Sequence, residues 1–244
     1  MTPAWKNGAL GLGAAAIGAL VAVAAMQGLG RSRGPDPAAT GAIVRSYILD
    51  HPDILPEAMD RLHRRETAAL VAANRAAIET PFAGAVGGNP KGDVTLVEYF
   101  DYACGYCRQS VKDVDRLAAS DTGLRIVYKE LPILSEWSEQ AARLSLGAAK
   151  AGRFGDYHHA LYAEKPSAGT ALALAGKLGV DPAAATTAPD IGREIDTNLQ
   201  MARALRISGT PTFVVGDQVL SGAVGYDALR QAVAETRAGR AGAS

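Results

Sequence analysis

Two cysteines separated by two residues are the side chains of this sequence best suited to redox chemistry. They stand in Cys104-Gly105-Tyr106-Cys107 and are the only cysteines among the 244 residues. Residues 94–100, just before them, are mostly apolar, β-branched or aromatic, which predicts a buried strand. Residues 108–119, just after them, carry apolar side chains at helical spacing. The pair is therefore predicted where a strand passes into a helix.

That position favours a reactive thiolate. The N-terminus of a helix presents unpaired N–H groups and the positive end of the helix dipole, and a thiol placed there has a pKa below its usual value of about 8.5. Cys104 would begin the helix and is the predicted nucleophile. Cys107, about one turn later, is predicted to attack the mixed disulfide and release the substrate. Tyr106 lies between them and is a candidate substrate contact.

Other roles for the cysteines fit the sequence less well. A structural disulfide across two residues would close a very short loop, which gains little chain entropy. A zinc site would need more ligands, but there is no second Cys-x-x-Cys, and the four histidines (His51, His63, His158 and His159) lack close ligand spacing. The adjacent His158 and His159 would point about 100° apart on a helix and are predicted to be surface or cap residues. A redox pair that needs no cofactor is the favoured interpretation.

The composition argues against several classes of protein. Lys and Arg together number 25, as do Asp and Glu, so the formal net charge is zero. Nothing in the sequence suggests the basic patch or stripe that marks a nucleic-acid-binding protein. Two cysteines are too few for a small domain held together by disulfides. The length suits one domain with additions.

An uncharged segment near the N-terminus predicts export or membrane attachment. Residues 8–30 consist almost entirely of Gly, Ala, Leu, Val and Ile. This run is longer than the core of a signal peptide and long enough to span a bilayer. Ala22-Val23-Ala24 also matches a cleavage pattern. Residues 1–34 are therefore predicted to be a signal peptide or a membrane anchor, and both remain open.

Two motifs resemble those of a known family. The run Val-Glu-Tyr-Phe-Asp-Tyr-Ala-Cys-Gly-Tyr-Cys at 97–107 and the run Ser-Gly-Thr-Pro-Thr-Phe at 208–213 are similar to motifs of the DsbA-like thioredoxin-fold proteins. They look most like the branch that includes the suppressor-of-copper-sensitivity protein ScsC. The resemblance implies an α/β, thioredoxin-like domain over 83–240 with a helical insertion over 138–207. It also implies an oxidising compartment outside the cytoplasm.

The same resemblance gives roles to residues outside the cysteine motif. Glu98 matches an acid buried beneath the cysteines, which would move a proton during exchange and whose pKa desolvation would raise. The alternative is an edge-strand glutamate that faces water. Lys129 could pair with Glu98, or lie exposed at the end of its strand. Thr210 and Pro211 match a cis-proline turn that would hold the substrate backbone.

The remaining segments have clear helix and strand patterns. Two helices are predicted between Thr40 and Glu79, in an N-terminal segment over 35–82. The resemblance implies self-association through this segment, and packing on its own domain is the alternative. Residues 81–92 are predicted to form a hinge and a turn. Residues 124–132 should form a strand parallel to the first.

Together these patterns predict a thiol–disulfide oxidoreductase or isomerase that acts on exported polypeptides. It would lie on the periplasmic side of the inner membrane, anchored or released, with a membrane redox partner and no nucleic-acid partner. The alternative is a copper carrier or sequestration protein, because two thiolates can hold the soft ion Cu(I). Cys104 and Cys107 would then be the metal ligands. A third and weaker hypothesis is a scaffold in membrane biogenesis.

Overall fold

The computed structural model describes residues 36–241. The predicted signal peptide or membrane anchor over 1–34 lies outside these residues. Within them, no helix has both the length and the apolar character that crossing a bilayer requires. Contacts divide the described residues into two units, with the boundary between Met59 and Asp60.

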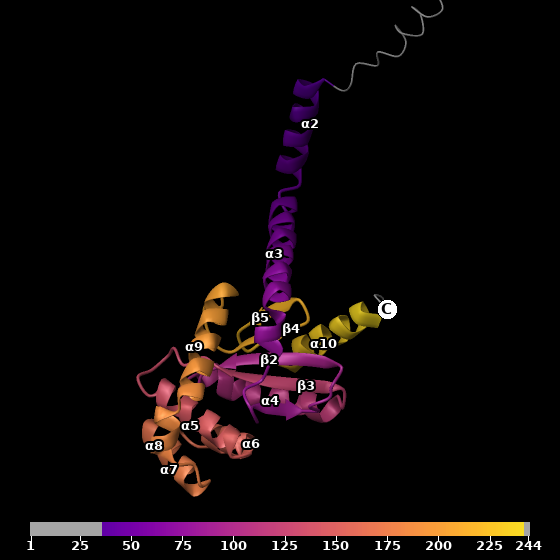
Figure 1. The fold of residues 1–244 in the computed structure, drawn as a ribbon. Helices are drawn as coiled ribbons and strands as arrows, with labels where there is room; N and C mark the ends of the chain where they lie inside the picture. The colour runs from indigo at the N-terminus through magenta and orange to yellow at the C-terminus, as the bar shows by residue number, and fades with distance from the viewer. Residues whose placement is uncertain (1–35, 242–244) are drawn as a thin grey trace, which may run out of the picture. The chain divides into compact units, whose positions relative to one another are not determined.

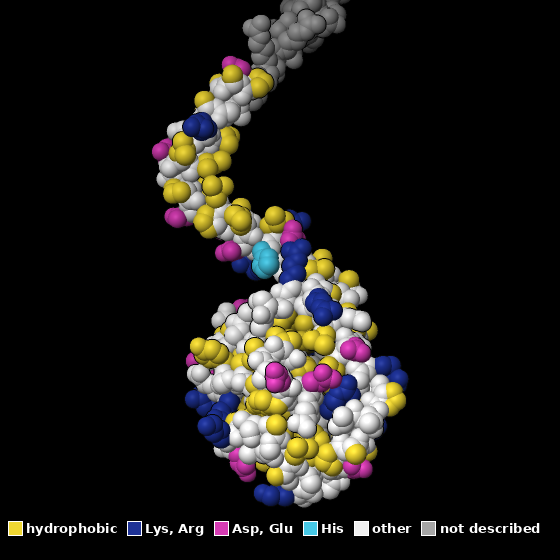
Figure 2. Space-filling view, turned by 90° about the vertical axis from the view of Figure 1, so that its left-hand side faces the viewer, with side chains coloured by type: hydrophobic (Ala, Val, Ile, Leu, Met, Phe, Trp, Pro, Cys, Tyr) yellow, Lys and Arg dark blue, Asp and Glu magenta, His cyan; other side chains and the backbone are white. Residues whose placement is uncertain are grey.

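The described part of the first unit is helical. Helix α2 (Pro37–Asp50) has proline in its first turn, and the side chain of Asp36 accepts a hydrogen bond from the Ala38 N–H at 3.0 Å. None of its side chains is buried, and Ile43 and Leu49 are 70% and 65% exposed. Figure 2 shows hydrophobic side chains along this helix in yellow. An exposed apolar surface of this kind is typical of an interaction site.

A five-stranded sheet forms the centre of the second unit (Figure 1). Strands β2 and β3 are parallel, as predicted, and the other neighbouring pairs are antiparallel. The order across the sheet is β1-β3-β2-β4-β5. The strands are β1 (Val86–Gly88), β2 (Val94–Phe100), β3 (Leu124–Glu130), β4 (Thr212–Val215) and β5 (Gln218–Ser221).

The edge strand β1 differs from the sequence prediction. The Gly-, Ala- and Pro-rich composition of residues 81–92 predicts a hinge and a turn. In the structure, Val86–Gly88 pairs antiparallel with β3. A Cβ atom on Gly87 would lie 3.0 Å from the ring of Tyr128. Glycine therefore permits a close approach of backbone and ring that strand propensity does not reveal.

Different apolar clusters fill the two faces of the sheet. Leu96 belongs to the cluster beneath α4 (Gly105–Ser120) and α10 (Gly225–Ala241). Val97, its neighbour in β2, belongs to the cluster with α9 (Pro189–Ala204) and the second half of α3 (Ile54–Glu79). Successive side chains of a strand point to opposite faces of the sheet. Alternate residues of β2 and β3 therefore pack against different sets of helices.

Five helices stand between β3 and β4, as expected for the helical insertion over 138–207. They are α5 (Ser138–Lys150), α6 (Phe154–Ala163), α7 (Ala168–Lys177), α8 (Pro182–Thr187) and α9. Helices α5 and α6 add Leu144, Leu161 and their neighbours to the same cluster as α4. The insertion therefore covers the sheet beside the cysteine-bearing helix.

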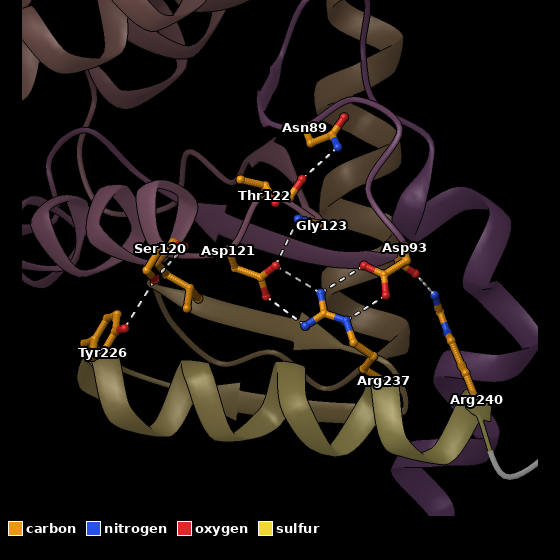
Figure 3. A network of polar contacts seen from close by, with 10 residues as sticks. Asn89, Asp93, Ser120, Asp121, Thr122, Gly123, Tyr226, Arg237 and Arg240 are labelled. Atoms are coloured by element: carbon orange, nitrogen blue, oxygen red, sulfur yellow. Dashed lines mark hydrogen bonds and ion pairs between the residues drawn. The ribbon is translucent and has the colours of Figure 1, made fainter.

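An ionic cluster attaches the last helix to the sheet (Figure 3). Arg237, on α10, donates from Nε to Asp93 at 2.6 Å and from Nη1 to Asp121 at 2.9 Å. Asp93 precedes β2, and Asp121 follows α4 and also accepts from the Gly123 N–H at 3.0 Å. One guanidinium thus joins α10 to the starts of β2 and β3 and the end of α4.

Candidate active site

Strand β2 leads the chain to two cysteines at the start of helix α4. Cys104 is the N-cap residue, and its Sγ atom accepts a hydrogen bond from the Cys107 backbone N–H at 3.4 Å. The Cys104 thiol donates to the carbonyl oxygen of Thr210 at 3.1 Å. Both cysteines are free thiols. The predicted strand–helix junction is confirmed.

The two thiols lie in different environments. Cys104 is 6% exposed, whereas Cys107 is completely buried. Hydrogen bonds from the Cys107 thiol and from the backbone N–H groups of the first turn lower the pKa of Cys104 to about 5. Burial raises the pKa of Cys107. At neutral pH, therefore, Cys104 is a thiolate and Cys107 is a thiol.

Glu98 lies in the middle of β2, on the face that α4 covers. It has the same parity as Leu96 and Phe100, which belong to the α4 cluster, and it is 3% exposed. Desolvation, with smaller contributions from Asp115 and Cys104, raises the pKa of its carboxyl to about 8. The predicted burial and raised pKa are confirmed, and the alternative of a glutamate that faces water is wrong.

Lys129 does not pair with Glu98. Its neighbours Val127 and Leu131 belong to the cluster on the opposite face of the sheet. There, its Nζ atom donates to Glu194 at 3.0 Å and to the Thr80 carbonyl at 2.7 Å. The predicted pair is wrong because the side chains of Glu98 and Lys129 lie on opposite faces of the sheet. The predicted exposure is also wrong, because Lys129 is 2% exposed.

The prediction of surface or cap histidines is wrong for His158. This residue is 2% exposed, and its Nδ1 atom lies 3.2 Å from the Tyr102 hydroxyl, which also bonds Ser145. Burial lowers the pKa of His158 to about 3, so its ring is neutral. His159 instead pairs with Asp115 at 3.0 Å. Within residues 36–241, no group of three or more potential ligands could hold a metal ion.

The predicted substrate contacts lie around the pair. The Thr210–Pro211 peptide bond is cis, as predicted. Because Thr212 pairs with Tyr99, the turn before β4 lies beside the end of β2. Tyr106, between the two cysteines, is 65% exposed.

Asp101 is a residue of this site that the sequence analysis did not single out. It is 1% exposed, and its carboxylate accepts hydrogen bonds from the backbone N–H groups of Ala103, Ile133 and Leu134 and from the Ser138 hydroxyl, all within 2.8–2.9 Å. It therefore joins the cysteine loop to the segment after β3. An acid directly after a buried strand and close before the cysteines was the available signal.

A small cleft opens beside Cys104. Its volume is about 120 Å³, and it is lined by Tyr102, Ala103, Cys104, Gly105, Arg108, Trp137 and Pro166. A larger groove of about 390 Å³, between α3 and β5, contains neither cysteine. The cleft at Cys104 is therefore the one that a substrate bonded to this thiol would meet.

Comparisons with known proteins agree with this geometry. Residues 95–234 match the family model described as a DSBA-like thioredoxin domain. Residues 37–69 match the model described as the copper resistance protein ScsC N-terminal domain.

Two solved structures are similar over most of the chain. A thioredoxin-like oxidoreductase from Silicibacter pomeroyi DSS-3 is 37% identical, with a TM-score of 0.64, over 67% of this chain and 98% of that one. A linker-deletion mutant of ScsC from Proteus mirabilis is 26% identical, with a TM-score of 0.67, over 85% of this chain and 99% of that one.

One curated relative is the Na(+)/H(+) antiporter NhaA 3 of Salinispora tropica, 31% identical over 159 residues, or 61% of this chain and 24% of that protein. The chain spans about a quarter of the length of the curated relatives it matches. With two free cysteines at the start of α4 and a family match over more than half of its length, the chain belongs to the DsbA-like thioredoxin-domain family of thiol–disulfide oxidoreductases.

Proposed function

We propose that this protein catalyses thiol–disulfide exchange on exported polypeptides. The observation that supports this most strongly is the unequal state of the two thiols, with a lowered pKa at Cys104 and a raised one at Cys107. Cys104 is the nucleophile and Cys107 the resolving residue. Glu98 exchanges a proton with Cys107, and the turn at Thr210 and Pro211 holds the substrate backbone.

The exchange consists of two displacements. To reduce a client disulfide, the Cys104 thiolate attacks one client sulfur, forms a mixed disulfide and expels the other client sulfur as a thiolate. Cys107 then gives its proton to Glu98, in the fraction of molecules whose carboxyl is ionised at a pKa of about 8, and attacks the Sγ atom of Cys104. This releases the second client thiolate and leaves a Cys104–Cys107 disulfide, so two electrons pass to the client. The reverse sequence oxidises a client dithiol.

The direction of exchange depends on the reduction potential of the pair. A Cys104 pKa of about 5 stabilises the reduced form, and a more stable reduced form makes the disulfide a stronger oxidant. This favours an oxidase or an isomerase over a reductase.

Assays on the purified full chain test the proposal. We expect reactivation of scrambled ribonuclease and a measurable redox equilibrium with glutathione. Cys104→Ser should abolish exchange, while Cys107→Ser should accumulate the mixed disulfide. A folded wild-type protein that neither oxidises reduced ribonuclease, nor reactivates scrambled ribonuclease, nor reduces insulin would refute the proposal.

The proposed compartment is the periplasmic side of the inner membrane. The uncharged segment over 8–30 supports export, with anchoring or cleavage as the two outcomes. A membrane redox partner would restore the cysteine pair after each turnover. Cell fractionation and protease protection test the location, and a protein found only in the cytoplasm would contradict it.

The N-terminal segment over 35–82 is proposed to form a homo-oligomer. The exposed apolar residues of α2 and the match of residues 37–69 to the ScsC N-terminal domain support this. Light scattering should give a multiple of the single-chain mass. The double variant Ile43→Ser and Tyr47→Ser should reduce it to one chain, while the control Ser46→Ala should not. A wild-type monomer would contradict the proposal.

A second candidate function is the binding of Cu(I) by Cys104 and Cys107. The match to a copper resistance domain and the thiolate character of Cys104 support it. Burial of Cys107 opposes it, because that thiol must lose its proton to bind the ion. An anaerobic Cu(I) titration of the reduced protein tests this. Tight binding that is lost in Cys104→Ser, in a protein without exchange activity, would favour the carrier.

A further inference from the structure

The cleft beside Cys104 combines a cation with apolar walls. Arg108 follows Cys104 by one helical turn, and its backbone N–H donates to the Cys104 carbonyl at 3.2 Å. The two side chains therefore lie on the same face of α4. Trp137 and Pro166 provide apolar surface in the same cleft. The cleft has a volume of about 120 Å³. On this measure one water molecule needs about 10–15 Å³, so the cleft has room for one short side chain.

One nitrogen of the Arg108 side chain holds the guanidinium in place. Its Nε atom donates to the Tyr162 carbonyl oxygen at 2.7 Å. Among the described residues, no hydrogen bond or ion pair engages the two terminal nitrogens. Glu136 and Glu164, which lie close in sequence to the cleft residues Trp137 and Pro166, form no ion pair with them. The end of a guanidinium with both terminal nitrogens available matches the two oxygens of a carboxylate.

We propose that this cleft selects client polypeptides that carry an aspartate or glutamate next to the reacting cysteine. The client carboxylate binds the terminal nitrogens of Arg108, and its methylene groups contact Trp137 and Pro166. This inference rests on the proposed exchange function. In the mixed disulfide the client sulfur is bonded to Cys104, and Cys104 lines the cleft. The client residue next to the reacting cysteine can therefore reach the cleft. Arg108 is therefore a specificity-determining residue that contacts the client but takes no part in the exchange reaction itself.

The test uses short peptides whose single cysteine is linked by a disulfide to 2-thiopyridine. The Cys104 thiolate attacks the peptide sulfur and expels pyridine-2-thione, whose absorbance gives the rate, and Cys107 then releases the peptide. Three peptides differ only in having Glu, Gln or Lys beside the cysteine. The reporter group is uncharged, so the peptide supplies the only variable charge.

We expect the wild-type full chain to react about tenfold faster with the Glu peptide than with the Gln peptide, because a charge-assisted, two-point contact is gained. Arg108→Gln should reduce this ratio to less than about twofold, and Arg108→Lys should keep an intermediate ratio. Lys112→Gln is the matched control: it removes one positive charge a turn further along α4, outside the cleft, and should keep the wild-type ratio. Circular dichroism of each variant confirms folding.

Equal rates with the three peptides would overturn the inference and leave the proposed exchange function standing. The same holds if Lys112→Gln lowers the ratio as much as Arg108→Gln, because the preference would then come from general charge on the helix. A folded, reduced wild-type protein that reacts with none of the peptides would overturn both the exchange function and this inference.

Discussion

The Sγ atom of Cys104 lies 3.1 Å from the carbonyl oxygen of Thr210, although 106 positions separate the two residues. The thiol can donate this hydrogen bond only while it is protonated. Thr210 also carries a hydroxyl, and its Oγ1 atom is buried without a hydrogen-bond partner among the described residues. An interaction with the Thr210 side chain is also among the causes that lower the pKa of Cys104, so this hydroxyl is the donor that we expect to bond the sulfur once Cys104 has become a thiolate.

Removal of the Thr210 hydroxyl should make the thiolate form of Cys104 less stable. Thr210→Val is expected to raise the pKa of Cys104 by up to about one unit, because a donor to the charged form is removed. Titration of the thiolate absorbance measures this. Thr212→Val is the control: its hydroxyl donates to the Gly209 carbonyl at 2.8 Å, so its loss should reduce stability by about 1 kcal/mol without moving the thiol pKa. An unchanged pKa in Thr210→Val would contradict the argument.

The reactivity of Cys104 should follow its lowered pKa. The rate of modification of the reduced protein by a neutral alkylating reagent is expected to rise with pH through about 5 and then to level off. Cys107 should stay unmodified while the protein is folded, because it is buried and protonated. Mass spectrometry of the alkylated sites distinguishes the two thiols. A midpoint near the ordinary thiol pKa of about 8.5 would show that the helix start does not activate Cys104.

Glu98 should make folding less favourable as the pH rises. The pKa of its carboxyl is about 8 in the folded protein, against an ordinary value of 4.5, so the folded state binds more protons between these values. Its stability contribution is complete below the lower pKa and is lost as the pH rises through the upper one. Relative to wild type, Glu98→Gln should therefore gain up to about 1.4 kcal/mol of unfolding free energy per pH unit in this window.

Urea denaturation of both proteins across this pH range measures the effect. The exposed Glu136→Gln should show no such dependence, which controls for the general loss of a carboxylate. Glu98→Gln should also prolong the mixed disulfide, because Cys107 loses its proton acceptor. A pH-independent stability difference would mean that Glu98 is ionised in the folded protein.

Asp101 should be essential for the arrangement of the site. Asp101→Ala leaves the backbone N–H groups of Ile133 and Leu134 and the buried Ser138 hydroxyl without their acceptor, and a hydrogen bond to a charged group contributes about 1.5–3 kcal/mol. We expect a loss of about 3–5 kcal/mol in denaturant unfolding, with slower exchange. The exposed Asp156→Ala should cost less than about 1 kcal/mol. A similar cost for both variants would contradict this role.

Lys129 should act in stability and not in exchange. It forms a buried ion pair with Glu194 at 3.0 Å, on the face of the sheet away from the cysteines. Removing one partner, as in Lys129→Met, should cost about 3–5 kcal/mol, whereas the double variant with Glu194→Leu should recover much of it. The exchange rate of the double variant should match wild type. A large loss of exchange activity in a stable double variant would contradict this prediction and indicate that Lys129 takes part in exchange.

Local patterns were sufficient to predict much of the site. The strand before Cys104 and the helix after it follow from the spacing of apolar residues, and a thiol at a helix start is activated by backbone groups of its own segment. The burial of Glu98 followed from its place in an apolar strand together with the family motif. These features depend on neighbours in the chain, so the sequence alone carries them.

Contacts between distant segments needed the tertiary structure. Whether Lys129 meets Glu98 depends on the parity of two strands across the sheet, and their register sets this. His158 is buried because the insertion packs its helix against Phe100 and Tyr102, which helical periodicity does not encode. Arg108, Trp137 and Pro166 come from three segments and form one cleft only when the insertion folds against α4. The sequence determined the reactive sulfur pair, because its chemistry is local, and the fold decided what surrounds it, because long-range packing places those groups.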